Sequence, residues 1–160
     1  MSMIGNFLAV PQEELSALFD TPENIGSTLY EKHSDNVVDL DKAWHAIHFV
    51  LTGEQYGGAP PLANAVFGEA PIGEEDVGYG PALGTQAESV KQIAEAICAI
   101  EENDFRKRID IPALSEAEIY PSIWDEGPEA ADYITDYFKE LQSFYKDAAQ
   151  NNMAVITFIN

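Results

Sequence analysis

The segment from Leu40 to Gly53 constrains the fold more than any other stretch of the chain. It contains one of the two tryptophans and two of the three histidines. Its bulky residues recur at intervals of three and four, the spacing that puts side chains on one face of an α-helix: Leu40, Trp44, Ile47, His48 and Leu51. Asp39 or Asp41 can cap the start of such a helix, and Gly53 can end it. The sequence therefore predicts a core helix with one polar edge, around which the other elements pack.

Two apolar runs near the ends of the chain predict strands, from Met3 to Val10 and from Met153 to Ile159. The second run is apolar at successive positions, which is typical of a strand buried on both faces. We expect the two strands to pair. An apolar stripe predicts that the longest helix runs from Gly127-Pro128 to about Asn151. Thr85, with Glu88 three residues later, has the pattern of a capping box that starts another helix.

The order of the predicted elements is strand, helices, short strands or loops, helices, strand. This order predicts an α+β fold, in which a small mixed β-sheet of about four strands is packed with several helices. A chain of 160 residues without a linker or a repeat is long enough for a real hydrophobic core. We therefore expect a single domain over residues 1–160.

The charge of the chain limits its partners. Eight basic and 28 acidic residues give a formal net charge of −20, so nucleic acids and anionic membranes would be repelled. A basic partner protein fits better, although acidic surfaces also serve solubility. The single cysteine, Cys98, cannot form an intrachain disulfide, and the sequence has no signal peptide or apolar run long enough to span a membrane. These features predict a cytoplasmic protein.

Several short motifs follow one another along the chain: Met1-x-Met3-Ile4-Gly5, Trp44-x3-His48-Phe49-x-Leu51-Thr52-Gly53, Leu62-x2-Ala65-x2-Gly68, Glu118-Ile119-Tyr120-Pro121 and Val155-Ile156. This ordered set covers nearly the whole chain and resembles the YfbM-like bacterial proteins, also called the DUF1877 family. The resemblance implies an α+β domain of this length, but it assigns no activity. It implies that some members act as immunity proteins near toxin genes. His48 falls at the family's histidine position, whereas His45 lies outside the family pattern.

Catalytic and metal chemistry receive little support. Asp41, His45 and His48 can lie along one side of a helix, but a zinc site would need a fourth ligand, and the cysteine pairs of a structural site are absent. We expect instead that His45 is exposed and that His48 is a core histidine bonded to a buried polar partner. Ser122 or Cys98 could complete a triad by composition only, because the chain has no Gly-x-Ser-x-Gly elbow. Cys98 is expected to be a small buried hydrophobe. The sequence thus predicts no catalytic residue, no metal and no cofactor.

Aromatic residues in loop-like segments form the candidate binding surface. Tyr79, Tyr120 and Trp124 occur near glycine or proline, and loop aromatics on a rigid scaffold are common in binding sites. With residues of the predicted core helix they could line one pocket, formed by Trp44, His48, Thr52, Tyr79, Tyr120 and Trp124. The alternative is that Trp44 and Tyr120 only fill the core.

Three hypotheses for function follow. The first is a non-enzymatic protein-binding domain whose acidic surface meets a basic partner. An immunity-type protein is one form of this hypothesis. The second is a small-molecule-binding protein or hydrolase with a pocket around His48, Tyr120 and Trp124. The third is a stable domain that acts only as part of a complex. The accessibility of His48 separates the second hypothesis from the others.

Overall fold

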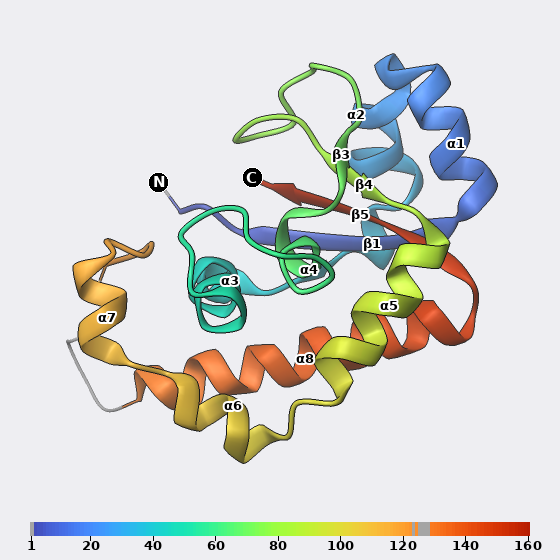
Figure 1. Ribbon diagram of the computed structural model, residues 1–160. Coiled ribbons are helices and arrows are strands. Elements are labelled where there is room, and N and C mark those ends of the chain that lie inside the picture. The colour runs from blue at the N-terminus through green and yellow to red at the C-terminus, as the bar shows by residue number, and fades with distance from the viewer. Residues whose placement is uncertain (1, 123, 125–128) are drawn as a thin grey trace.

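The strands formed by the two ends of the chain lie side by side at the centre of one sheet. The computed structural model describes residues 2–122, 124 and 129–160. In it, β1 (Gly5–Pro11) pairs antiparallel with β5 (Met153–Ile159) along its full length. The predicted pairing of the terminal strands is therefore confirmed (Figure 1).

The sheet has five strands in the order β2-β1-β5-β4-β3, with β2 at Val38–Asp39, β3 at Ala70–Pro71 and β4 at Leu83–Thr85. Helices pack on this sheet, so the α+β class is confirmed. Every pairing among the described strands is antiparallel, so the prediction of a mixed sheet is wrong, and the sheet has five strands where about four were predicted. The three short strands carry two or three residues each, too few for a periodic pattern to reveal them in the sequence.

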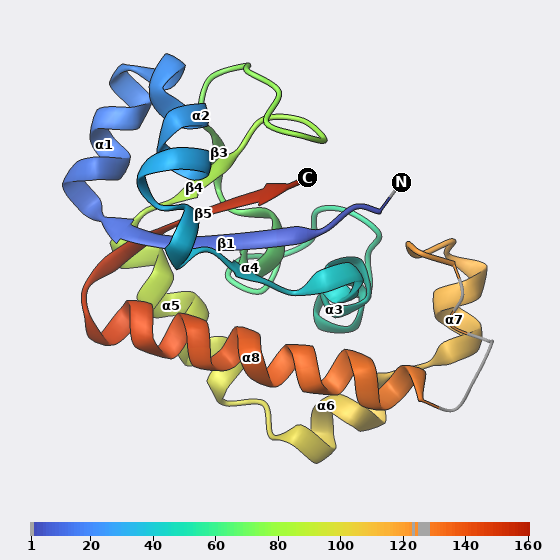
Figure 2. The same cartoon turned by 180° about the vertical axis from the view of Figure 1, so that it is seen from behind.

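Both faces of β5 are buried. Because successive side chains of a strand point to opposite sides of the sheet, they enter two different hydrophobic clusters. Val155 belongs to one hydrophobic cluster, and Ala154, Ile156 and Phe158 belong to another. The cluster of Val155 is built with α3 (Trp44–Thr52), α5 (Ala87–Cys98) and α8 (Ala130–Gln150). The opposite cluster is built with α1 (Gln12–Asp20) and α2 (Ile25–Ser27). Figures 1 and 2 show these two helical layers on either side of the sheet.

Shorter elements complete the chain. The α-helices are α4 (Asn64–Phe67), α6 (Glu102–Arg108) and α7 (Ile111–Glu116). Four further helical turns are η1 (Pro22–Asn24), η2 (Thr28–Lys32), η3 (Ser34–Asn36) and η4 (Asp41–Ala43). Within the described residues, no helix combines the length and apolar character needed to cross a membrane.

The ends of three helices test the predicted caps. Gly53 ends α3 in the left-handed conformation, with φ of 77°, as predicted. The aspartates do not cap α3, because its N-cap is Ala43 and η4 precedes it. The capping box at Thr85 is also wrong: Thr85 pairs with Val155 at the end of β4, and α5 begins at Ala87. The predicted start of the longest helix, at residues 127–128, lies outside the described residues.

Candidate functional site

The N-terminal turn of α3 places Trp44 at the centre of an aromatic cluster, which comprises Trp44, His45, Tyr56, Phe67 and Tyr120. The Trp44 ring stacks on Tyr120 with centroids 5.8 Å apart, and its edge contacts Phe67 at 5.9 Å. Gly5 makes this packing possible, because a Cβ atom at Gly5 would lie 2.7 Å from Cβ of Trp44.

Trp44 and Tyr120 together hold the segment that precedes β1. The indole N–H of Trp44 donates to the carbonyl of Met3 at 2.9 Å, and the amide of Met3 donates to the hydroxyl of Tyr120 at 2.8 Å. The indole nitrogen of Trp44 and the hydroxyl of Tyr120 are thus both engaged in hydrogen bonds within the protein. Trp44 is buried and Tyr120 half-buried, as expected for residues that fill the core.

His45 is buried, with 2% of its surface exposed, so the prediction that it is exposed is wrong. Its ring lies between Trp44 and Tyr56, at centroid distances of 5.1 and 5.2 Å. Nδ1 accepts the amide N–H of Tyr120 at 2.9 Å, so this nitrogen carries no proton, and Nε2 donates to the carbonyl of Gln55 at 3.0 Å. Burial lowers the pKa of His45, and the Gln55 carbonyl partly opposes that effect. His45 is therefore a neutral histidine that joins two loops, a role that its position outside the family pattern did not reveal.

His48 is completely buried, with 0% exposure, and its ring contacts Phe67 at a centroid distance of 4.5 Å. Neither ring nitrogen has a hydrogen-bond partner among the described residues, so the predicted buried polar partner is not found. Burial lowers the pKa of His48 to about 4; the backbone of Gly57, which lies near the ring but outside hydrogen-bond geometry, opposes this effect, and His45 adds to it. A general base must reach the proton that it removes. A substrate cannot reach His48 in this conformation, which weakens the hydrolase hypothesis.

The other predicted site residues lie in separate parts of the structure and do not share one pocket. Thr52 donates to the carbonyl of His48 at 2.8 Å and accepts the amide of Glu54 at 3.1 Å, so its hydroxyl helps to end α3. Trp124 is buried, and its indole N–H donates to the carbonyl of Ile119 at 2.9 Å. The ring centroid of Trp124 lies 6.3 Å from that of Tyr133. Among the described rings, no aromatic contact joins Trp124 to Trp44.

Tyr79 is exposed and lines a small cavity of about 30 Å³ between α4 and the sheet. Phe67 lines the same cavity and also contacts the Trp44 ring, so it connects the cavity to the aromatic cluster. Phe67 was not among the predicted site residues. The only available signal was its position at the end of a short apolar helical segment.

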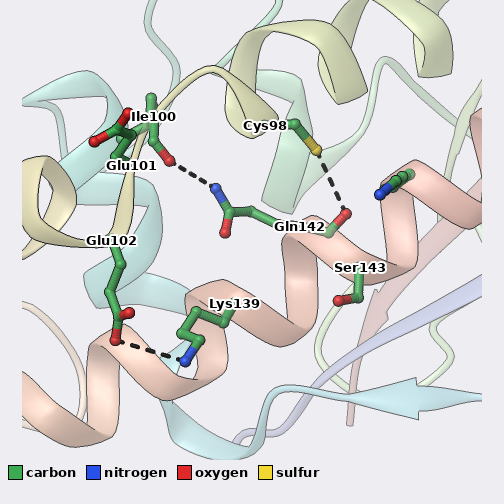
Figure 3. A pocket seen from close by; sticks show the side chains of 8 residues that line it. Cys98, Ile100, Glu101, Glu102, Lys139, Gln142 and Ser143 are labelled. Carbon is green, nitrogen blue, oxygen red and sulfur yellow. Dashed lines mark hydrogen bonds and ion pairs between the residues drawn. The ribbon is translucent and has the colours of Figure 1, made fainter.

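A larger groove of about 420 Å³ lies between α8 and the α5–α6 connection (Figure 3). The amide of Gln142 donates from α8 to the carbonyls of Ile97 and Ile100, at 2.8 and 2.9 Å. Glutamates and lysines also line the groove, and a loose ion pair joins Lys139 to Glu102 at 3.6 Å.

Cys98 lies at the edge of this groove and is exposed, so the prediction that it is buried is wrong. Its thiol donates to the carbonyl of Gln142 at 3.7 Å. Partial burial raises the pKa of the thiol, and Lys146 opposes that effect. Because the thiolate is the nucleophilic form, a raised pKa argues against a reactive cysteine at neutral pH.

The residues of the zinc hypothesis do not converge. Asp41 accepts the hydroxyl of Tyr133 at 2.7 Å, His45 binds backbone groups, and His48 is enclosed. In the parts of the chain that the structure describes, no group of three or more histidine, cysteine, aspartate or glutamate residues could hold a metal ion.

One surface combines carboxylates with tyrosine rings. We call it the acidic face and define it as Asp39, Asp41, Tyr133, Tyr137 and Glu140. Tyr133 and Tyr137 are half-buried on α8, and their rings meet edge to face at 5.1 Å. Partial burial and the nearby carboxylates of Asp41, Asp39 and Glu140 raise the pKa of Tyr137. Burial and the hydrogen bond to Asp41 likewise raise the pKa of Tyr133.

Comparison with known proteins agrees with this architecture. The family described as "Domain of unknown function (DUF1877)" matches residues 1–158. Protein YfbM of Escherichia coli strain K12 is 28% identical over 172 aligned positions, which cover 99% of each chain. The crystal structure of YfbM from Escherichia coli, titled as a protein of unknown function, superposes with a TM-score of 0.77 at 27% identity. That alignment covers 98% of this chain and 99% of the other.

Proposed function

This chain belongs to the DUF1877 family, as its ordered motifs predicted, and we propose that it is a non-enzymatic domain that binds a basic partner protein through its acidic face. The observation that carries the proposal is the arrangement of three carboxylates around two half-buried tyrosine rings. An immunity-type role, in which the partner is a basic toxin, is one form of this function.

The acidic face has the composition of a surface that receives lysine or arginine. Asp39 and Glu140 are exposed, so their charges are available to a partner. The rings of Tyr133 and Tyr137 offer apolar area and a π-face, to which a cation is attracted. The hydroxyl of Tyr133 is held by Asp41 at 2.7 Å and by the backbone amide of Lys42 at 3.1 Å, so that ring is fixed before a partner arrives.

The cations near the acidic face do not cancel its charge. Lys139 lies on the same helix but pairs with Glu102, and Lys42, which follows Asp41 in the chain, is a single charge beside three carboxylates. The overall charge of −20 adds a long-range field of the same sign. Such a field steers a basic partner and raises its association rate, by about tenfold or more at low salt.

The test compares two double variants of equal charge change. Asp39→Asn with Glu140→Gln removes two carboxylates of the acidic face, whereas Glu74→Gln with Glu75→Gln removes two exposed carboxylates of the loop after β3. Each protein serves as bait for extracts of its own cells at low salt, and the retained partner is then purified for binding kinetics. We expect the first variant to lose the partner or to bind it about tenfold more slowly, and the second to bind like the wild type. Equal behaviour of the two variants, or no partner for the wild type, contradicts the proposal.

A further inference from the structure

Two threonine hydroxyls on the sheet face below α4 have no hydrogen-bond partner among the described residues. Thr85 on β4 is 0% exposed and Thr157 on β5 is 2% exposed. Leu83 pairs with Thr157, and Thr85 pairs with Val155, so the two threonines are diagonal neighbours on the same face of the sheet. Buried hydroxyls are normally satisfied, either by protein groups or by ordered water.

A cavity next to Thr157 has space for a hydrogen-bonding molecule. Thr157 lines the cavity of about 30 Å³ that Phe67, Tyr79 and Leu83 also border; Thr85 does not border it, but its hydroxyl lies, like that of Thr157, beside Gly68. About 10–15 Å³ of such volume holds one water molecule, so the cavity has room for about two. It is too small for a metabolite, and its lining supplies no carboxylate or imidazole for a metal.

The hydroxyls of Thr85 and Thr157 both lie close to Gly68. A Cβ atom on Gly68 would lie 3.1 Å from the hydroxyl oxygen of Thr157 and 3.4 Å from that of Thr85. Both oxygens therefore lie against the backbone that leaves α4, which packs on this part of the sheet (Figure 1). Gly68 also has a positive φ of 76°, so a side chain is disfavoured there for two reasons.

We propose that this cavity is an internal water-binding site, in which water bridges the hydroxyls of Thr85 and Thr157. The bridge links β4 to β5 beneath the end of α4. It thereby supports the position of Phe67, the residue that contacts both Trp44 and His48. This inference is independent of the proposed protein-binding function.

Two measurements test the proposal. The first detects cross-relaxation between long-lived water and the γ-methyl group of Thr157 in the wild-type protein by NMR. The second compares thermal midpoints of Thr85→Val, Thr157→Val and the double variant, because valine resembles threonine in shape but cannot bind water.

If water bridges the two hydroxyls, the NMR signal is present and each single variant lowers the midpoint by about 3 °C. The double variant then loses less than the sum of the single losses, because both substitutions remove the same bridge. A dry cavity predicts the opposite sign, since valine would replace an unsatisfied hydroxyl. The absence of the NMR signal, or a midpoint that stays constant or rises in Thr157→Val, overturns the proposal. If a variant does not fold, the NMR measurement on the wild type decides alone.

Discussion

Burial of His48 predicts that acid destabilises the protein through this single side chain. The pKa of His48 falls from an ordinary value of 6.5 to about 4 in the folded state. The unfolded chain therefore binds a proton between these two pH values that the folded chain does not bind. Stability due to the neutral ring is complete above pH 6.5 and decreases as the pH falls towards about 4.

The size of this effect follows from the two pKa values. A tenfold difference in proton affinity corresponds to about 1.4 kcal/mol, so the full loss is about 3 kcal/mol. Between pH 7 and pH 5, about 2 kcal/mol of it is lost. This is a large share of the stability of a domain, which is typically about 5–15 kcal/mol.

The assay is urea unfolding at pH 7 and pH 5 for the wild type and for His48→Gln, which cannot titrate in this range. Carboxylates and His45 titrate in both proteins, so the difference between their pH dependences isolates His48. We expect the wild type to lose about 2 kcal/mol more than the variant. An equal loss would refute the reasoning. If His48→Gln does not fold, NMR titration of the His48 ring in the wild type replaces the comparison, and a midpoint near 6.5 would refute it equally.

Three further predictions rest on single contacts. Gly5→Ala places a Cβ atom 2.7 Å from Cβ of Trp44 and should cost about 1–3 kcal/mol in denaturant unfolding; unchanged stability would contradict this packing. Gln142→Ala removes the amide group that donates to the carbonyls of Ile97 and Ile100 and should cost about 1–3 kcal/mol, whereas Ser143→Ala, an exposed neighbour in the same groove, should change stability by less than about 0.5 kcal/mol. The thiol of Cys98 should be alkylated slowly at pH 7 and faster as the pH rises above 9, and rapid labelling at pH 7 would show that its pKa is not raised.

The core helix and the long C-terminal helix were predictable because their own side chains repeat with the helical period. The strands β1 and β5 were predictable as well, because β1 is a short apolar run and β5 is rich in β-branched residues. The edge strands β2 and β3 were not predictable to the same degree, because two residues carry no period and depend on the neighbour with which they pair.

The candidate site was only partly predictable. Trp44 and Tyr120 come together as expected. Their contact forms only because the tertiary fold brings a loop far along the chain against α3. Trp124 belongs to a different neighbourhood, beside Tyr133. No local pattern distinguishes the surroundings of Tyr120 from those of Trp124, because both are aromatic residues near the same proline in the sequence.

The sequence by itself determined the family, the α+β class and the burial of the last strand on both faces, since each depends on composition, order or local period. The tertiary structure alone decided the state of the two histidines on α3. Spacing placed His45 and His48 on one helix, but their burial comes from Tyr56, Phe67 and the backbone of distant loops. Burial removes an imidazole from water, and that loss of solvation keeps both rings neutral.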